Sequence, residues 1–271
     1  MDLFLQRGTV DHDGETIYWE LATTGDDDDR PVVVLSHGAG GTHAVWYHQV
    51  PALGQHFRVL TWDSRGFGLS TNRRNAPSAP AAGADLAAVM NELGIDAAHL
   101  VGQSMGGWHT SAFVQQHPTR VSSIVYADTV GGLWTPSLQH AFAEFMKGGG
   151  LGRPGPQAIG SHPALWPGTV KRDPAHAFLY EALGSFHTPP MDKIGTTIEW
   201  AIDHADIDAL GIPVLFIAGE HDSLFPPALL AESCAMLANS RYVEIADAGH
   251  SPYFEQPVAW NDAVTDFLQT V

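Results

Sequence analysis

The chain has 271 residues, of which 44% are hydrophobic and 16% charged, and this composition excludes an intrinsically disordered protein. Acidic residues outnumber basic ones by 30 to 13, and the formal net charge of −17 disfavours nucleic acid or an anionic membrane as a partner. The single cysteine, Cys234, excludes an internal disulfide. No apolar stretch approaches the ~20 residues that cross a bilayer, and residues 1–14 lack a signal-peptide pattern, so we expect a cytoplasmic location.

Strand-like and helix-like segments alternate along the chain. Thr16–Leu21 is rich in β-branched and aromatic residues, and Asp11–Gly14 before it has the chemistry of a hairpin turn. Pro31–Ser36 is a continuous apolar run, typical of a strand buried on both faces of a parallel sheet. Later runs of the same character are Arg58–Trp62, His99–Val101, Val121–Ala127, Val214–Ala218 and Arg241–Ile245. Helical patterns cover Ala84–Leu93, Met105–Gln116, Ala228–Leu237 and Val258–Leu268. The alternation predicts an α/β fold with a mostly parallel sheet covered on both faces.

One interval breaks this rhythm. Residues 133–206 contain no convincing buried strand but many prolines, glycines and aromatic residues. We therefore predict a helical lid over 133–206, inserted into a core formed by 1–132 and 207–271. Trp134 and Trp166 are candidates for an apolar substrate pocket, although packing of the lid onto the core is the better explanation for any single one of these aromatic residues.

Gly102-Gln103-Ser104-Met105-Gly106 is a G-x-S-x-G motif between a predicted strand and a predicted helix. Such a nucleophile elbow holds its serine on a strained turn, and side chains at the two glycines would collide with their surroundings. The start of the helix also supplies partial positive charge where an oxyanion develops. Ser104 is the predicted nucleophile.

His37-Gly38-Ala39-Gly40-Gly41 follows the buried strand that ends at Ser36. A small, glycine-rich turn allows backbone N–H groups to point into a site. The predicted oxyanion hole consists of the N–H groups of Ala39 and Met105, while His37 is expected to brace the loop. Gly38 and Gln103 are further candidates for the substrate pocket.

A serine hydroxyl needs a neighbouring base, and the chain has 15 histidines. His250 follows the strand Arg241–Ile245, at the carboxyl end of a strand, where open α/β sheets build their sites. Asp222 follows Val214–Ala218 in the same manner and is the predicted acid that orients His250. Asp128, at the end of Val121–Ala127, and Glu220 are the alternative acids.

Together these residues resemble the α/β-hydrolase superfamily over nearly the whole chain outside the lid. Asp63–Ser70 is similar to its D-x-R-G-x-G-x-S turn, in which Arg65 is expected to pair with a carboxylate, and the order Ser104, Asp222, His250 is that of the family. The resemblance implies an α/β-hydrolase fold with an eight-stranded, mostly parallel sheet flanked by helices and a helical lid. A serine at the elbow argues against haloalkane dehalogenases and epoxide hydrolases, which have aspartate there.

Small lidded carboxylesterases and enol-lactonases are the most similar members. The resemblance therefore implies hydrolysis of a small-molecule ester or lactone through an acyl-enzyme, without metal or cofactor. Carbon–carbon bond hydrolases of vinylogous diketones and cofactor-free perhydrolases use the same triad, but Gly40–His43 and Ser251 depart from the carbon–carbon hydrolase pattern. A hormone-receptor-like binding protein that hydrolyses its ligand slowly is the alternative from another class. The sequence defines neither the acyl and alcohol groups nor an oligomeric state.

Overall fold

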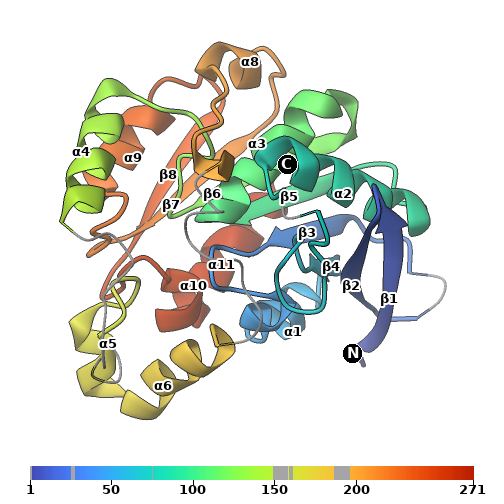
Figure 1. Cartoon of the computed structure of the whole chain (residues 1–271), viewed down its shortest axis with the longest axis horizontal. Coiled ribbons are helices and arrows are strands. Elements are labelled where there is room, and N and C mark those ends of the chain that lie inside the picture. The colour runs from blue at the N-terminus through green and yellow to red at the C-terminus, as the bar shows by residue number, and fades with distance from the viewer. Residues whose placement is uncertain (1, 26–27, 75, 149–157, 159–160, 186–195) are drawn as a thin grey trace.

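The computed structural model describes residues 2–25, 28–74, 76–148, 158, 161–185 and 196–271. Its centre is an eight-stranded sheet with the order β1-β2-β4-β3-β5-β6-β7-β8 (Figure 1). The pairs β1–β2 and β2–β4 are antiparallel and all the others are parallel. The predicted eight-stranded, mostly parallel sheet is confirmed.

The bounds of these elements agree with most of the predicted ranges. The strands are β1 (Phe4–His12), β2 (Glu15–Thr23), β3 (Val32–Ser36), β4 (Arg58–Trp62), β5 (Ala98–Gln103), β6 (Val121–Ala127), β7 (Val214–Gly219) and β8 (Ser240–Ile245). The helices are η1 (His43–Trp46), α1 (Gln49–Leu53), α2 (Ala79–Glu92), α3 (Met105–Gln116), η2 (Pro118–Arg120), α4 (Pro136–Lys147), α5 (Pro167–Arg172), α6 (Pro174–Leu183), α8 (His204–Asp208), α9 (Pro227–Cys234), α10 (Pro252–Glu255) and α11 (Pro257–Leu268).

Helices cover both faces of the sheet, with α2 and α3 on one side and α1 and α11 on the other (Figure 1). Strand β3 explains why both faces are apolar. Its alternate residues Val32 and Val34 belong to the core under α2 and α3, whereas Val33 and Leu35 belong to the opposite core. Each such buried side chain contributes about 1.5–3 kcal/mol relative to an exposed one. The continuous apolar run was therefore a correct signal for a central parallel strand.

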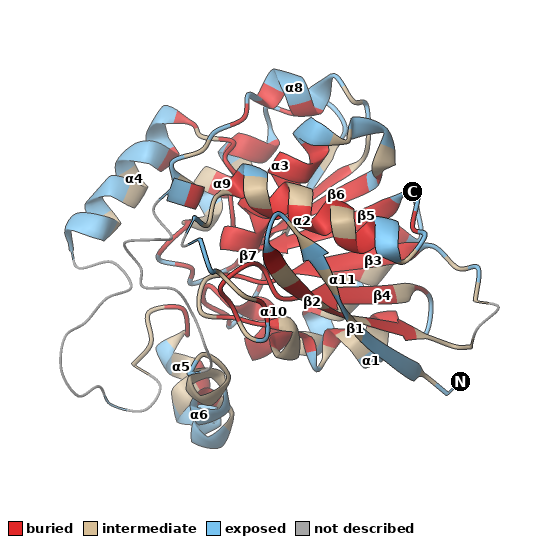
Figure 2. Cartoon of the chain, turned by 45° about the vertical axis from the view of Figure 1, so that its right-hand side comes forward, coloured by how far each residue is buried: buried red, intermediate tan, exposed pale blue. Residues whose placement is uncertain are grey.

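Two elements differ from the sequence-based ranges for local reasons. Helix α2 begins five residues earlier than Ala84, because the Ser78 hydroxyl caps its first turn by accepting the N–H of Ala81 and Pro80 suits the start of a helix. Strand β1 had no predicted range. It is an edge strand exposed along most of its length (Figure 2), so its sequence carries little apolar alternation.

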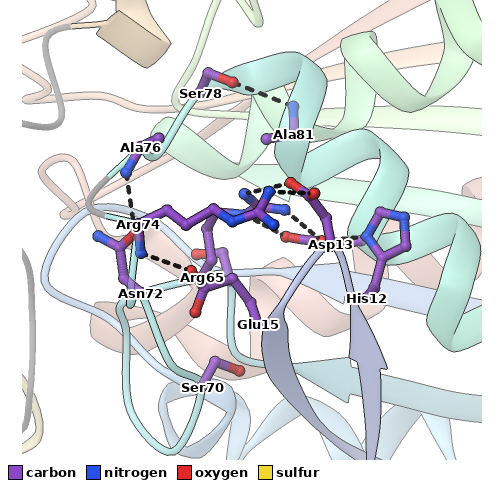
Figure 3. A network of polar contacts seen from close by, with 12 residues as sticks. His12, Asp13, Glu15, Arg65, Ser70, Asn72, Arg74, Ala76, Ser78 and Ala81 are labelled. Atoms are coloured by element: carbon purple, nitrogen blue, oxygen red, sulfur yellow. Dashed lines mark hydrogen bonds and ion pairs between the residues drawn. The ribbon is translucent and has the colours of Figure 1, made fainter.

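A polar network ties the D-x-R-G turn to the β1–β2 hairpin (Figure 3). Arg65 donates from Nε and Nη2 to the two carboxylate oxygens of Asp85 at 2.7 Å, as predicted for a carboxylate partner. His12 Nδ1 lies 2.7 Å from the same carboxylate, and Glu15 accepts the backbone N–H groups of Arg73 and Arg74. Because the Arg65–Asp85 pair is buried, this network fixes the turn.

The described residues of the interval 133–206 form helices and contain no strand. Figure 1 places α4 beside α9, and α5 and α6 further along the same edge of the molecule. The lid and its boundaries remain predictions. In the described part of the chain, every helix falls short of the length and hydropathy that a membrane span requires.

A buried histidine is expected to make the fold sensitive to acid. His109 of α3 is buried, its Nδ1 has no hydrogen-bond partner among the described residues, and burial lowers its pKa to about 3. The unfolded chain therefore binds a proton that the folded chain does not between pH ~6.5 and ~3, so stability is lost as the pH falls through that range.

For His109→Phe, the loss of unfolding free energy between pH 7 and pH 5 should be smaller than in the wild type by about 2 kcal/mol. Urea denaturation at the two pH values measures this difference, and the exposed His56 offers a control as His56→Gln. Equal pH dependence in the wild type and His109→Phe would show that His109 is not a source of acid sensitivity.

Candidate active site

Ser104 lies on a sharp turn between β5 and α3, with φ 49° and ψ −122°. A non-glycine residue in such a region costs on the order of 1–3 kcal/mol and persists only where its surroundings impose it. A Cβ at Gly106 would collide with the backbone oxygen of Ser36 on β3, and one at Gly102 would lie 2.6 Å from the Gly106 oxygen. The predicted steric need for both glycines is confirmed.

Ser104, His250 and Asp222 form a continuous hydrogen-bonded line. His250 Nε2 lies 2.8 Å from Ser104 Oγ, and His250 Nδ1 lies 2.9 Å from Asp222 Oδ2. His250 and Asp222 are buried, and the other oxygen of Asp222 accepts the N–H groups of Leu224 and Phe225. The carboxylate favours the proton on Nδ1, which leaves the Nε2 lone pair directed at the serine hydroxyl.

The backbone on either side of His250 is also fixed. Gln103 Nε2 donates to the His250 carbonyl at 3.0 Å, and the N–H of Gly249 donates to Glu255 at 2.7 Å. Glu255 also accepts the Trp166 N–H at 2.8 Å and the Thr169 hydroxyl at 2.6 Å, so it joins the histidine loop to α5. Burial raises the pKa of Glu255 despite these donors.

The loop after β3 contains a bracing histidine, as expected. His37 Nδ1 lies 2.8 Å from the Gly38 carbonyl, and His37 Nε2 accepts the N–H of Ser64 at 3.1 Å. Burial lowers the pKa of His37, which is consistent with a neutral ring that donates at Nδ1 and accepts at Nε2. Met105 opens α3, so its N–H has no partner within the helix. Ala39 and Met105 remain the predicted oxyanion donors.

Two cavities of different character meet at Ala39, beside Ser104. The smaller, of about 40 Å³, has a mainly aromatic and aliphatic wall that includes Trp108, Phe142, Phe145, Met146, Ile198 and Phe225. The larger, of about 160 Å³, has a wall of mixed character, in which the polar side chains of Gln103, His162, Tyr180 and Glu181 lie beside apolar groups and the backbone of Gly38.

Charge is scarce around these two cavities. Burial raises the pKa of Tyr180 to about 12 and lowers that of His162, so both side chains are neutral at pH 7. Among the described residues that line the two cavities, neither lysine nor arginine occurs, and Glu181 is the one acidic residue. The described part of the lining therefore has no lysine or arginine to bind a carboxylate.

The remaining candidate residues lie outside these cavities. Trp134 packs against Trp108 and Phe142, with ring centroids 5.8 and 5.4 Å away, and Trp166 stacks on His221 at 4.6 Å. Glu220 is exposed and accepts the N–H of Asp247, away from His250. The hydrogen bonds thus bring Asp222, and neither alternative acid, to His250 Nδ1. The sequence-based reasoning missed Glu255, because its partners are up to 89 residues away in the chain.

Comparison with known proteins shows the family to which the chain belongs. The sequence profile of the α/β hydrolase fold family matches residues 31–257. A Caulobacter sp. (strain K31) protein named "Putative carbamate hydrolase RutD" is 31% identical, over 97% of this chain and 98% of its own length. Two solved structures are each 26% identical. One is a thermophilic esterase from Thermogutta terrifontis (TM-score 0.77, covering 98% of both chains), and the other is the enol-lactonase from Burkholderia xenovorans LB400 (TM-score 0.78, 97% of this chain and 100% of the other). The chain belongs to the α/β-hydrolase family.

Proposed function

We propose that this protein is a serine hydrolase that cleaves a carboxylic ester or lactone through an acyl-enzyme. The observation that carries the proposal is the line from Ser104 Oγ through His250 to Asp222, with contacts of 2.8 and 2.9 Å, beside two cavities. Membership of the α/β-hydrolase family supports hydrolase activity, and the relatives named esterase and enol-lactonase support a C–O ester bond as its target.

In the proposed mechanism, Ser104 Oγ attacks the substrate carbonyl while His250 Nε2 takes the hydroxyl proton. Asp222 stabilises the resulting imidazolium, and the N–H groups of Ala39 and Met105 donate to the oxyanion. His250 then gives the proton to the leaving oxygen, which departs as the alcohol. Water activated by His250 attacks the acyl-enzyme and releases the carboxylic acid.

The walls of the two cavities favour a neutral substrate. An apolar acyl group fits the aromatic wall around Phe142 and Phe145, and a polar leaving group fits the wall that contains Tyr180 and Glu181. A carboxylate on the acyl chain would be buried without a positive partner among the described lining residues, at a considerable desolvation cost. The net charge of −17 opposes an anionic substrate at longer range as well.

A matched pair of aryl esters tests the bond and the charge together. We expect p-nitrophenyl butyrate to be cleaved with a kcat/KM about 10²-fold higher than p-nitrophenyl hemisuccinate, whose acyl chain ends in a carboxylate. Equal kcat/KM values would contradict the preference for a neutral acyl group.

A wider panel would distinguish the alternative bonds. It includes a small lactone, an aryl carbamate, a dienone-type carbon–carbon substrate and a perhydrolysis assay with hydrogen peroxide. If the carbamate, the carbon–carbon substrate or the perhydrolysis reaction is turned over faster than every ester and lactone, that reaction would replace ester or lactone hydrolysis as the proposed function. Tight ligand retention with less than one turnover would favour the binding-protein alternative.

A further inference from the structure

A second buried carboxyl group lies next to the candidate triad. Asp128 follows β6, and its side chain is fully buried. One of its oxygens, one oxygen of Asp222 and one ring nitrogen of His250 all lie within 4.8 Å of one another. The N–H of Asp128 donates to the Ile217 carbonyl on β7 at 2.7 Å, and its φ is +50°. The sheet itself therefore holds this residue in a strained conformation beside the site.

The two carboxyl groups have unequal sets of donors. Asp222 accepts hydrogen bonds from His250 Nδ1 and from the N–H groups of Leu224 and Phe225. Oδ1 of Asp128 accepts the N–H of Gly219 at 2.8 Å, whereas its Oδ2 is buried and has no donor among the described residues. Two neighbouring buried carboxylates strongly disfavour double ionisation. A proton shared by the pair therefore belongs on Asp128, which has fewer donors to stabilise a negative charge.

We propose that Asp128 is protonated on Oδ2 in the active protein and donates this O–H as a hydrogen bond to the Asp222 carboxylate. The proton stays on Asp128 throughout, so no bond is made or broken there. Asp128 is thus a positioning residue that acts through Asp222, and this role rests on the proposed function.

The surrounding groups support a neutral Asp128. Burial and the negative charge of Asp222 raise the pKa of Asp128 well above its ordinary value, with Glu255 of α10 as a further acidic neighbour. The tyrosines that interact with it electrostatically, Tyr180, Tyr242 and Tyr253, have pKa values raised by burial and are neutral phenols at pH 7. Among the described residues, the charged groups that most influence the pKa of Asp128 are Asp222 and Glu255, and both are acidic.

The shared proton has a consequence for His250. The Asp222 carboxylate beside Nδ1 holds the imidazole in the tautomer that directs the Nε2 lone pair at Ser104. A second negative charge within 4.8 Å would favour the imidazolium, which cannot take the proton of Ser104. The neutral Asp128 therefore keeps His250 available as a base while its O–H supplies a further hydrogen bond to the Asp222 carboxylate.

The substitution Asp128→Asn exchanges one neutral donor for another, since its amide can donate to Asp222 and accept from Gly219. We expect the kcat of this variant to lie within about threefold of the wild-type value. The acid limb of its kcat/KM–pH profile should lie within about 0.3 pH units of the wild-type limb. Asp128→Leu, which removes the donor, should lower kcat about tenfold or more.

If Asp128 were ionised in the wild type, Asp128→Asn would remove a negative charge near His250. The acid limb of the profile would then move to lower pH by about one unit or more, which would overturn the proposal. Glu220→Gln is the matched control, because it removes an exposed negative charge from the loop that contains Asp222.

An infrared difference spectrum of wild type minus Asp128→Asn at pH 7 tests the proton without any substrate. A protonated-carboxyl C=O band is expected, and its absence would overturn the proposal even if ester turnover is found. Conversely, if no ester is cleaved, the band still decides where the proton lies. If Asp128→Asn does not fold, the same band is sought in wild type minus Asp128→Leu. Loss of wild-type activity on adding a chelator, restored by a divalent cation, would assign the cluster to a metal and also overturn the proposal.

Discussion

Replacement of Ser104 by alanine is expected to lower kcat for ester hydrolysis by about 10⁴–10⁶-fold. The variant lacks the hydroxyl that attacks the carbonyl in the proposed mechanism, so any remaining turnover would come from water held near the proposed oxyanion donors. The fold should survive, because alanine removes a single atom from a side chain whose position is set by Gly102 and Gly106. Steady-state kinetics with an aryl ester, together with the melting temperature of the variant, measures both expectations.

Ser122 is an exposed serine on β6 and provides the matched control as Ser122→Ala, for which wild-type turnover is expected. An organophosphorus probe should label the wild type stoichiometrically and leave Ser104→Ala unlabelled. Residual turnover above about 1% of the wild-type rate, or labelling of another residue, would mean that Ser104 is not the nucleophile.

The sequence predicted best those features of the site that a short segment of the chain specifies by itself. The elbow at Ser104 needs two glycines within a five-residue segment, and the structure supplies the steric reason for each. The positions of Asp222 and His250 followed from a simple rule, since parallel strands present their carboxyl ends at one edge of the sheet. The alternation of β3 between two cores explains why the central strands were recognisable.

Features that depend on distant partners were not predictable in the same way. Glu255 is one carboxylate among 30 acidic residues in the sequence, and it gains its role from Gly249, Trp166 and Thr169 only after folding. Asp128 was recognised as an alternative acid, but its relation to Asp222 depends on how many donors each carboxyl group receives. Donor counts of this kind depend on tertiary packing, on which a single sequence carries no direct signal.

The substitution His250→Ala is expected to lower kcat as much as Ser104→Ala does. The 2.8 Å contact between Ser104 and His250 indicates that the two side chains act together in one proton transfer. Without the imidazole, the serine keeps its proton and is a poor nucleophile; without the serine, the imidazole has no hydroxyl to activate.

The double variant Ser104→Ala/His250→Ala should therefore be no slower than either single variant, within about threefold, whereas independent effects would multiply to about 10⁸-fold or more. Single-turnover kinetics on the three variants measures this coupling, with His140→Ala on the exposed face of α4 as the histidine control. A multiplicative loss would mean that His250 acts on the reaction separately from Ser104. The 2.8 Å contact would then be a feature of the resting protein, and the general base would have to be sought elsewhere around the cavities, with His162 of the larger cavity as the first residue to test.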